Sequence, residues 1–460
     1  MSDAMKASLE DVPLNSFHKK LAVYSSAAPF LDGYVLSIIG VVMVQISAAL
    51  ALTPLEEGLV AASSLFGMFL GGFLGGLFTD KLGRKTLYLL VLVFLAVFSL
   101  AQFWVASAVA LITLRLLLGM AIGADHPLAT SLLAEFLPKK QRGSILASLV
   151  MVWFIGAAAA YVVGEVILRV AGDEAWRWAL ASAFVPAVLF LFLRAGTPES
   201  ARWLMNKGRT AEADQVIKKV YGEGYSVHHL PEKKNGHNVS VGQLFHSGYG
   251  KRIFFVSLFW TCAIIPQFAI YAFAPRILHT MGLTGEWASF GAVAITMMFV
   301  IGCLLAVKLI NPLGRRGLLM HSFLWSGLAL LLLGIFPDHS AIVTLLLFCA
   351  YALFIGGAQV LEYVYPNELF PTEVRGTAVG LATSLSRIGA AFGTYLIPVA
   401  LNSIGIANTM FVAFGISAVG FILALVMAPE TRSLDLHHAS VINDAAKPNA
   451  RALNQSTEFK

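Results

Sequence analysis

The sequence has few charged residues and almost no cysteine. Only 13% of its 460 residues are Asp, Glu, Lys or Arg, whereas an ordinary soluble domain is about a quarter charged. Cys262, Cys303 and Cys349 all lie in apolar runs, which predicts buried thiols and no disulfide framework. No complete nucleotide-binding loop is present either, because GYGKR at 248 lacks both the spacing and the Ser or Thr. These absences argue against a soluble enzyme and against transport driven by ATP.

Long hydrophobic runs make up most of the chain. Hydrophobic residues account for 58% of it, and the mean hydropathy is +0.76. Segments of roughly 20 apolar residues recur, and each is long enough to cross a bilayer. The sequence therefore predicts an all-α membrane protein with twelve spans at about 21–50, 56–79, 86–107, 109–135, 143–170, 175–194, 252–278, 286–308, 317–336, 341–367, 376–403 and 406–428.

The positive charges are distributed unevenly between the two sides of the predicted spans. Most of the 32 Lys and Arg residues lie in the terminal tails and the even-numbered loops, while the odd-numbered hairpins hold only Arg169, Arg177 and Arg276. Cytoplasmic loops carry an excess of Lys and Arg, so we expect both termini in the cytoplasm. The net charge of +6 then reflects topology, and no nucleic-acid partner is expected.

Three loop motifs occur twice in the same order. AEFLPKKQRG at 134–143 recurs as NELFPTEVRG at 367–376, DKLGRK at 80–85 as NPLGRR at 311–316, and PES at 198 as PET at 429. Repeated halves are typical of secondary transporters, which bind substrate near mid-membrane between the repeats. We expect a six-helix N-terminal half (1–194), a cytoplasmic linker (195–251), a six-helix C-terminal half (252–431) and a flexible tail (432–460).

These motifs resemble the major facilitator superfamily over essentially the whole chain. GLFTDKLGRK at 76–85 fits its signature between helices 2 and 3, and PESARWL at 198 is similar to the sugar-porter motif after helix 6. GADHPLATSLLAEF at 123 and DGY at 32 resemble motifs of phosphate, metabolite and aromatic-acid proton symporters. The resemblance to bacterial inner-membrane metabolite transporters implies a monomeric transporter in that membrane. It also implies no enzyme activity and no cofactor beyond the proton gradient.

Charged residues inside the predicted spans are candidate functional groups, because each costs roughly 2.5–3.5 kcal/mol to insert. Asp32 is the only charged residue between Leu21 and Leu55. A helical rise of about 1.5 Å per residue places Asp32 and Asp125 near mid-membrane and Arg115 near the outer boundary. We expect these three residues to take part in proton coupling, Asp32 above all. An acid that only holds helices together, paired with an arginine such as Arg115, is the alternative.

Arg387 is the strongest candidate for contact with substrate. The same depth count places it near mid-membrane, where a fixed guanidinium suits a carboxylate. A pair between Arg387 and Glu362 is the alternative. Glu362 is itself a candidate for the substrate site. Further candidates are Gln267, Tyr271, Tyr34 and Trp153, although plain helix packing explains each of these four equally well.

The repeated loops supply a predicted cytoplasmic gate. Its candidate residues are Asp80, Gly83, Arg84, Glu135, Arg142, Glu199, Arg315, Glu368, Arg375 and Glu430. The resemblance implies that such charges pair when the inside is closed and separate when it opens. Glycines four residues apart allow close helix contact, and the second span holds Gly67, Gly71 and Gly75, with Gly72 and Gly76 beside them. The resemblance implies that this span slides against the eleventh, where Gly376/Gly380 and Gly389/Gly393 repeat the pattern. Static packing is the alternative.

The sequence thus predicts a secondary transporter that works by alternating access. Proton-coupled symport of a small organic acid is the leading interpretation, because Arg387 suits an anion. Symport of a sugar or polyol is the alternative that PESARWL favours. Efflux, and a membrane sensor that does not transport, also remain open.

Overall fold

Helices joined by short loops make up the described part of the chain. The computed structural model describes residues 9, 12–230, 249–280, 282, 286–336, 340–370 and 372–432, and no strand occurs among them. The membrane helices are α2 (Ala27–Leu50), α3 (Pro54–Leu82), α4 (Arg84–Ala101), α5 (Ala108–Phe136), α6 (Lys139–Ala171), α7 (Ala175–Ala181), α8 (Phe184–Arg194), α12 (Gly250–Thr280), α13 (Glu286–Ile335), α14 (Ala341–Leu369), α15 (Thr372–Ser403) and α16 (Gly405–Met427). The shorter helices are α1 (Ser16–Ser25), α9 (Ala201–Asn206), α10 (Thr210–Tyr221), η2 (Gln102–Trp104), η3 (Gly172–Glu174) and η4 (Val227–His229).

These helices make twelve membrane crossings, as predicted. Nine stretches of the described chain are long and apolar enough to cross a membrane. Two of the nine hold two crossings each: Ser148–Arg194 contains α6 and the α7–α8 pair, and Phe290–Ile335 contains both parts of α13. The two parts of α13 meet at Gly314, whose φ of 75° is left-handed. The helix α3 supplies the remaining crossing.

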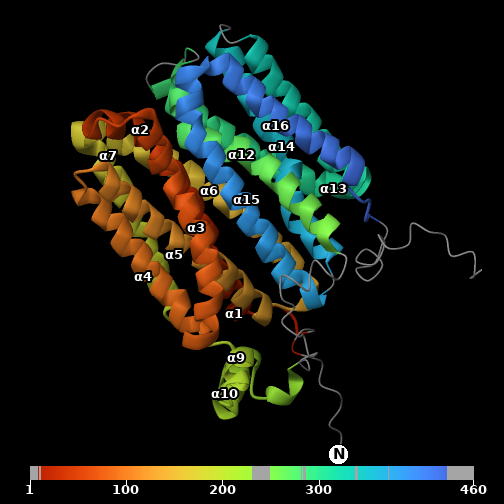
Figure 1. Cartoon of the computed structure of the whole chain (residues 1–460). Helices are drawn as coiled ribbons and strands as arrows, with labels where there is room; N and C mark the ends of the chain where they lie inside the picture. Colours follow the sequence, from red (N-terminus) through yellow and green to blue (C-terminus); the bar gives the residue numbers. More distant parts are fainter. Residues whose placement is uncertain are drawn as a thin grey trace, which may run out of the picture.

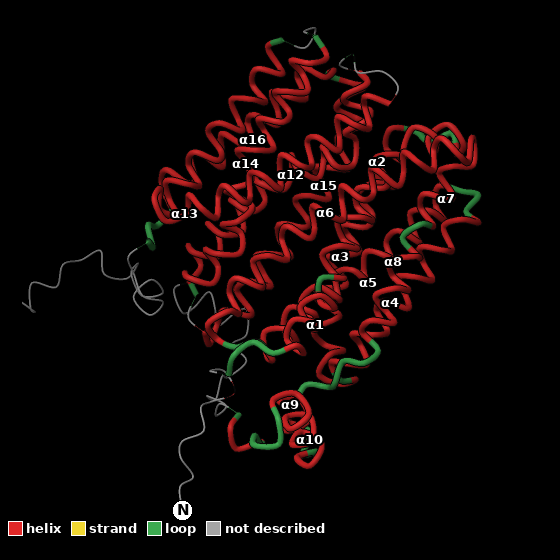
Figure 2. The backbone as a smooth tube through the Cα atoms, turned by 180° about the vertical axis from the view of Figure 1, so that it is seen from behind, coloured by secondary structure: helices red, strands yellow, loops and turns green. Residues whose placement is uncertain are grey.

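The crossings form two groups that lie side by side. Helices α2 to α8 lie on one side and α12 to α16 on the other, while α9 and α10 project beyond one end of the bundle (Figure 1). The view from behind shows the same arrangement (Figure 2). We call the end that carries α9 and α10 the linker end, and the opposite end the far end.

The halves touch each other in the part of the bundle nearer the far end. A Cβ atom on Gly58 of α3 would lie 2.1 Å from the carbonyl oxygen of Tyr395 on α15. A Cβ atom on Gly40 of α2 would lie 2.4 Å from the carbonyl oxygen of Tyr271 on α12. Tyr161 of α6 donates a 2.9 Å hydrogen bond to that same oxygen. Backbone contacts this close leave no room for a molecule to pass between these helices.

The expected contact between the second and eleventh spans is present. Helices α3 and α15 meet through Gly58 and Tyr395 and through the rings of Phe66 and Phe392, whose centroids are 5.6 Å apart. Of the glycines in the predicted pattern, Gly67 and Gly71 pack against the backbone of α5, and Gly389 packs against α12. Small residues allow close approach to any neighbouring helix, and these three serve contacts within each half.

The first part of the predicted linker is folded. Helices α9 and α10 pack their apolar faces around Leu204, Ala213 and Ile217, and Leu9 from the N-terminal segment is buried in the same cluster. Asn15, which caps α1, donates a 2.8 Å hydrogen bond to the carbonyl oxygen of Val220. Residues 231–248 of the predicted linker lie outside the described residues, and so does the tail predicted to be flexible, apart from Arg432.

Candidate functional site: a charged centre between the halves

Asp32 lies on α2 at the interface between the two halves. Gly33 lets α2 contact α6 closely, because a Cβ atom there would lie 2.0 Å from the carbonyl oxygen of Trp153. The Asp32 side chain is only 1% exposed, with Trp153 beside it and Arg387 as the charge that acts on it. Neither carboxylate oxygen accepts a hydrogen bond of normal geometry from a described residue. The Trp153 indole is close enough to act on Asp32 as a loose donor, but it does not meet hydrogen-bond geometry, so Asp32 is a buried acid without a fixed hydrogen-bonding partner.

Arg387 approaches this acid from α15 in the other half. Its guanidinium carbon lies 5.2 Å from the centre of the Phe268 ring on α12, a cation–π distance. Arg387 acts electrostatically on both Asp32 and Glu362, yet among the described residues no carboxylate comes within 4 Å of it. The N–H donors of Arg387 are therefore available to a substrate.

Glu362 is the second buried acid of this centre. It lies on α14, is 4% exposed, and its Oε1 has no hydrogen-bond partner among the described residues. Trp260 lies beside it, and Arg387 is the cation that acts on it. The phenol of Tyr363 lies within electrostatic reach of Asp32, Glu362 and Arg387. We call Asp32, Glu362 and Arg387 the central charged cluster.

Aromatic rings line the central charged cluster. Trp153 of α6 makes edge contacts with Phe268 at 5.8 Å and with Tyr271 at 5.1 Å between ring centroids. Gln267 precedes Tyr271 by four residues, so it lies on the same face of α12, and its Oε1 has no partner among the described residues. The structure therefore brings together five residues that the sequence suggested for the substrate site: Arg387, Glu362, Gln267, Tyr271 and Trp153.

Tyr34 does not join this group. Its hydroxyl lies 2.7 Å from the hydroxyl of Ser182, within the N-terminal half. Tyr34 follows Asp32 by two residues and so points to a different side of α2. The structure gives Tyr34 a packing role, which is the alternative that the sequence left open.

Asp125 forms a buried ion pair that the sequence did not predict. Arg194, the last residue of α8, binds its two carboxylate oxygens at 2.7 Å and 3.0 Å. Arg194 also donates to the carbonyl oxygens of Tyr24 and Tyr88, and its guanidinium lies 3.8 Å from the Tyr88 ring centre. The sequence assigned Arg194 to a helix end facing the cytoplasm, so it gave no sign of this pair. With its partner fixed, Asp125 is a poor candidate for carrying protons.

Arg115 is not the partner of either acid. It is fully buried in α5, and its Nε donates a 2.8 Å hydrogen bond to the carbonyl oxygen of Val60 on α3. The pairing of Arg115 with Asp32 or Asp125 that the sequence suggested is therefore absent, because Arg194 occupies Asp125 and Arg387 lies at Asp32. In this structure Arg115 joins α5 to α3.

Four predicted gate residues of the N-terminal half, Gly83, Arg84, Glu135 and Glu199, form one network at the linker end. Arg84 pairs with Glu135, and Ser200 donates a hydrogen bond to Glu135. The Glu199 carboxylate accepts hydrogen bonds from the first two backbone amides of α4 at 3.1 Å, which satisfies donors that a helix start leaves open. Gly83 precedes them with a φ of 92°, and a Cβ atom there would lie 2.7 Å from Glu199. Only glycine fits that position.

The C-terminal half repeats this network residue by residue. Arg315 pairs with Glu368 at 2.8 Å, and Thr431 donates to Glu368 at 2.5 Å. Glu430 accepts hydrogen bonds from two successive backbone amides, beginning with that of Arg315 at 3.0 Å. Gly314 has the same left-handed conformation as its counterpart in the first half, with a φ of 75°. The repeated PES and PET motifs already contained Ser200 and Thr431, so the sequence held the signal that would have identified them.

Three predicted gate residues cannot be placed in these networks. The side chains of Asp80, Arg142 and Arg375 lie outside the described set. The counterpart of Asp80 is Asn311, which accepts a 3.3 Å hydrogen bond from Arg315. The described ion pairs at the linker end thus join residues of the same half.

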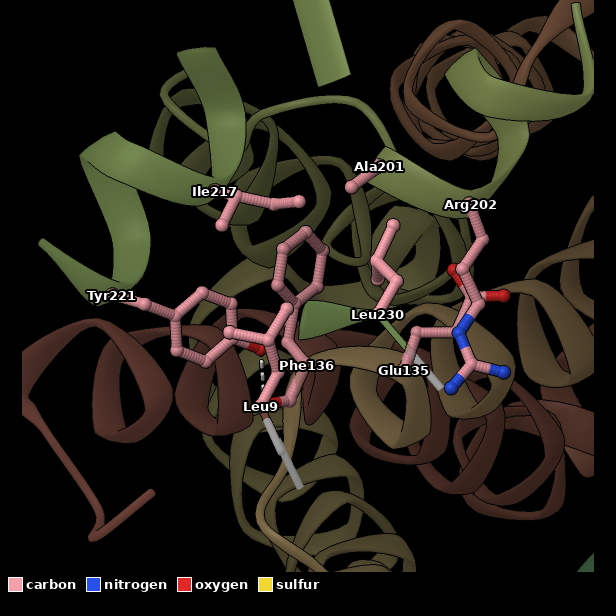
Figure 3. Close-up of a pocket in the computed structure, with 8 residues that line it drawn as sticks. All are labelled: Leu9, Glu135, Phe136, Ala201, Arg202, Ile217, Tyr221 and Leu230. Carbon is pink, nitrogen blue, oxygen red and sulfur yellow. Dashed lines mark hydrogen bonds between the residues drawn. The ribbon is translucent and has the colours of Figure 1, made fainter. Parts of the chain in front are cut away.

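A small pocket lies at the linker end, away from the central charged cluster. Figure 3 shows Leu9, Phe136 and Ile217 directed towards its interior, with Glu135 and Arg202 at one edge. The mainly apolar lining and the insertion of Leu9 make this pocket a packing site for the N-terminal segment.

Comparison with known proteins identifies the family of the chain. A family model described as "Sugar (and other) transporter" matches residues 21–442. YaaU of Escherichia coli (strain K12), provisionally named a metabolite transport protein, is 40% identical over 94% of this chain and 96% of its own. The inner membrane metabolite transport protein YgcS of the same organism is 36% identical over 95% of this chain and 97% of its own.

The fold also matches solved transporter structures. The xylose transporter XylE from E. coli, in a partially occluded inward-open conformation, superposes with a TM-score of 0.79. The match covers 92% of this chain and all of XylE at 20% identity, so it bears on the fold alone. The family model, the E. coli relatives and the two six-helix halves point the same way: the chain is a multi-pass membrane transporter, not an enzyme, and belongs to the sugar (and other) transporter family of the major facilitator superfamily.

Proposed function

We propose that the protein is a proton-coupled symporter of a small polar metabolite and that Asp32 carries the proton. The supporting observation is a buried carboxylate without a fixed hydrogen-bonding partner, held between the two halves beside Arg387. Such a group changes its proton affinity when its solvation or its distance from the cation changes. Movement of one half against the other alters both, so proton binding is linked to access.

The linker end faces the cytoplasm in this proposal. Most Lys and Arg residues lie in the loops and tails of that side, and cytoplasmic loops carry this excess. Contact between the halves nearer the far end then describes a state closed to the outside. The relative YgcS, by its name an inner membrane protein, supports a bacterial inner membrane as the location.

A sugar or polyol is the substrate class that the central charged cluster supports best. Two carboxylates accompany one guanidinium, so the cluster carries no excess of positive charge to attract an anion. Carboxylate and amide oxygens accept hydrogen bonds from hydroxyl groups, and the rings of Trp153 and Tyr271 supply the apolar lining that small-molecule sites use. The family description, sugar (and other) transporter, favours the same class.

A small organic acid is the second candidate, and the free guanidinium of Arg387 favours it. Arg387 rests on Phe268 without a carboxylate within ion-pairing distance among the described residues. Arg387→Lys would keep the charge but lose the planar donor fork, so affinity for an anionic substrate should fall, and Arg387→Gln should abolish most of it. A sugar should tolerate Arg387→Lys.

Two measurements test the proposal. Thermal-shift screening of the purified protein against sugars, polyols and organic acids identifies a ligand, and the Arg387 variants then assign its class. For a sugar, Arg387→Gln combined with Glu362→Gln should recover transport that Arg387→Gln loses, since the unpaired acid is also removed. Failure of that rescue would favour the organic acid.

The role of Asp32 has its own test in proteoliposomes loaded with the ligand found by the screen. Asp32→Asn should abolish accumulation driven by a pH gradient and retain counterflow, because exchange does not require the proton to leave. Asp173→Asn, in the exposed η3 turn, is the matched control and should behave as wild type. Full accumulation by Asp32→Asn would remove Asp32 from the proposal.

A further inference from the structure

The central charged cluster contains one more carboxylate than cations. Asp32 comes from the N-terminal half, and Glu362 and Arg387 come from the C-terminal half. Both acids are buried, and their unpartnered oxygens share Arg387 as the cation that acts on them. If both acids were ionised, one negative charge would remain uncompensated.

The neighbouring groups do not compensate it. The titratable side chains that face Glu362 from α13 and α14 are Cys303, Tyr351 and Tyr363, and Tyr363 also faces Asp32. Tyrosine and cysteine are uncharged in this pH range. Trp153 and Trp260, beside the two acids, do not titrate. Among the described residues, the charge of the site is therefore set by Asp32, Glu362 and Arg387 alone.

We propose that Asp32 and Glu362 hold one shared proton, and that the cluster binds as many protons as it has carboxylates in excess of cations. An uncompensated buried charge is strongly unfavourable, so the closed cluster takes up one proton and becomes neutral. Both acids interact with the same guanidinium, so the ionisation of one changes how fully Arg387 compensates the other. The proton therefore moves to whichever acid lies farther from Arg387 as the halves move. This proposal deepens the proposed symport and rests on it for the direction of proton flow.

The proposal predicts an unusual equivalence between two substitutions. Asp32→Asn and Glu362→Gln each leave one acid opposite one arginine, so each variant should hold no proton. The double variant Asp32→Asn/Glu362→Gln should hold none either, although its charge becomes positive. Arg387→Gln should hold two protons, and Asp32→Asn/Arg387→Gln should hold one, as in the wild type.

Infrared difference spectroscopy of the lipid-reconstituted protein at neutral pH counts these protons without a substrate. The C=O stretch of one protonated carboxyl should disappear in each single acid variant, and the second substitution should remove nothing further. Arg387→Gln should gain one such band. Glu212→Gln, an acid of the exposed α10 surface, is the control and should leave the spectrum unchanged.

Each other outcome overturns the proposal. Loss of the band in only one acid variant would mean that the proton belongs to that residue alone. Further loss in the double variant would mean that both acids are neutral, and no loss at all would mean that both are ionised. The acid variants decide the question even if Arg387→Gln does not fold. A proton count as predicted, together with transport that ignores the pH gradient, would refute the proposed symport and leave the shared proton standing.

Discussion

Asp32 and Asp125 are buried acids on neighbouring helices of one half, yet their surroundings give them opposite tasks. Asp125 has both oxygens bound by Arg194, which is itself held by two backbone carbonyls. Asp32 has no such bonds and lies at the interface between the halves, which move against each other in the proposed transport cycle. An acid whose partner is fixed stabilises the fold. When the partner belongs to the other half, the ionisation of the acid depends on how the two halves are placed.

Removing the Asp125 carboxylate should therefore destabilise the fold. Asp125→Asn leaves the Arg194 guanidinium buried without a counter-charge, and breaking a buried pair in this way costs about 3–5 kcal/mol. Thermal unfolding in detergent should show a clear loss of stability. Asp125→Asn combined with Arg194→Met should recover much of it, and Asp32→Asn alone should lose little. A stable Asp125→Asn variant would contradict the structural role.

At the scale of elements, apolar runs predicted the helices well but not which of their faces meet. A run of about 20 apolar residues identifies a crossing whatever its neighbours are, so the twelve crossings followed from the sequence. The helices that Gly67 and Gly389 contact did not follow from the sequence. A small residue lets another helix come close but does not specify which helix. Depth in the membrane singled out Arg387, whereas Glu362 and Trp153 entered the prediction as its possible ion-pair partner and as a possible aromatic wall. Arg194 was missed because its long side chain reaches inward from a helix end.

The α2–α6 contact can be tested through one of its glycines. Gly33→Ala places a carbon 2.0 Å from the Trp153 carbonyl oxygen, so the two helices must separate and Asp32 must shift. We expect lower thermal stability together with weaker pH-driven transport. Gly415→Ala on α16, where a Cβ atom meets nothing within 4 Å, should be neutral or more stable by up to about 1 kcal/mol. Equal behaviour of the two variants would contradict the close contact.

At the scale of the whole molecule, the contacts at the two ends differ in kind. Nearer the far end, backbones of opposite halves touch directly. At the linker end, Arg84–Glu135 and Arg315–Glu368 tie together helices of the same half. The first arrangement holds the halves together, and the second joins helices within each half, so that each half would stay intact during the proposed movement.

Arg84→Ala tests this division. The Arg84 and Glu135 side chains are 24% and 16% exposed, and pairs near the surface contribute about 1 kcal/mol or less, so folding should survive. The linker-end helix termini of the first half should loosen, because Arg84 no longer joins α4 to α5 there. Labelling of single cysteines introduced at the linker ends of α5 and α14 should become faster. Unchanged labelling at both ends of the bundle would remove Arg84 from the gate.

The duplicated end networks also bear on the covalent link between the halves. Each half supplies its own carboxylate to cap its own helix, Glu199 for α4 and Glu430 for the second part of α13. Helices α9 and α10 belong with the first half, since Tyr221 donates to the carbonyl oxygen of Phe136 and Asn15 binds Val220. A gene cut between codons 230 and 249 would therefore encode two fragments, each with its own caps and ion pairs complete. Co-expressed, the two polypeptides should find each other in the bilayer and transport as the intact chain does.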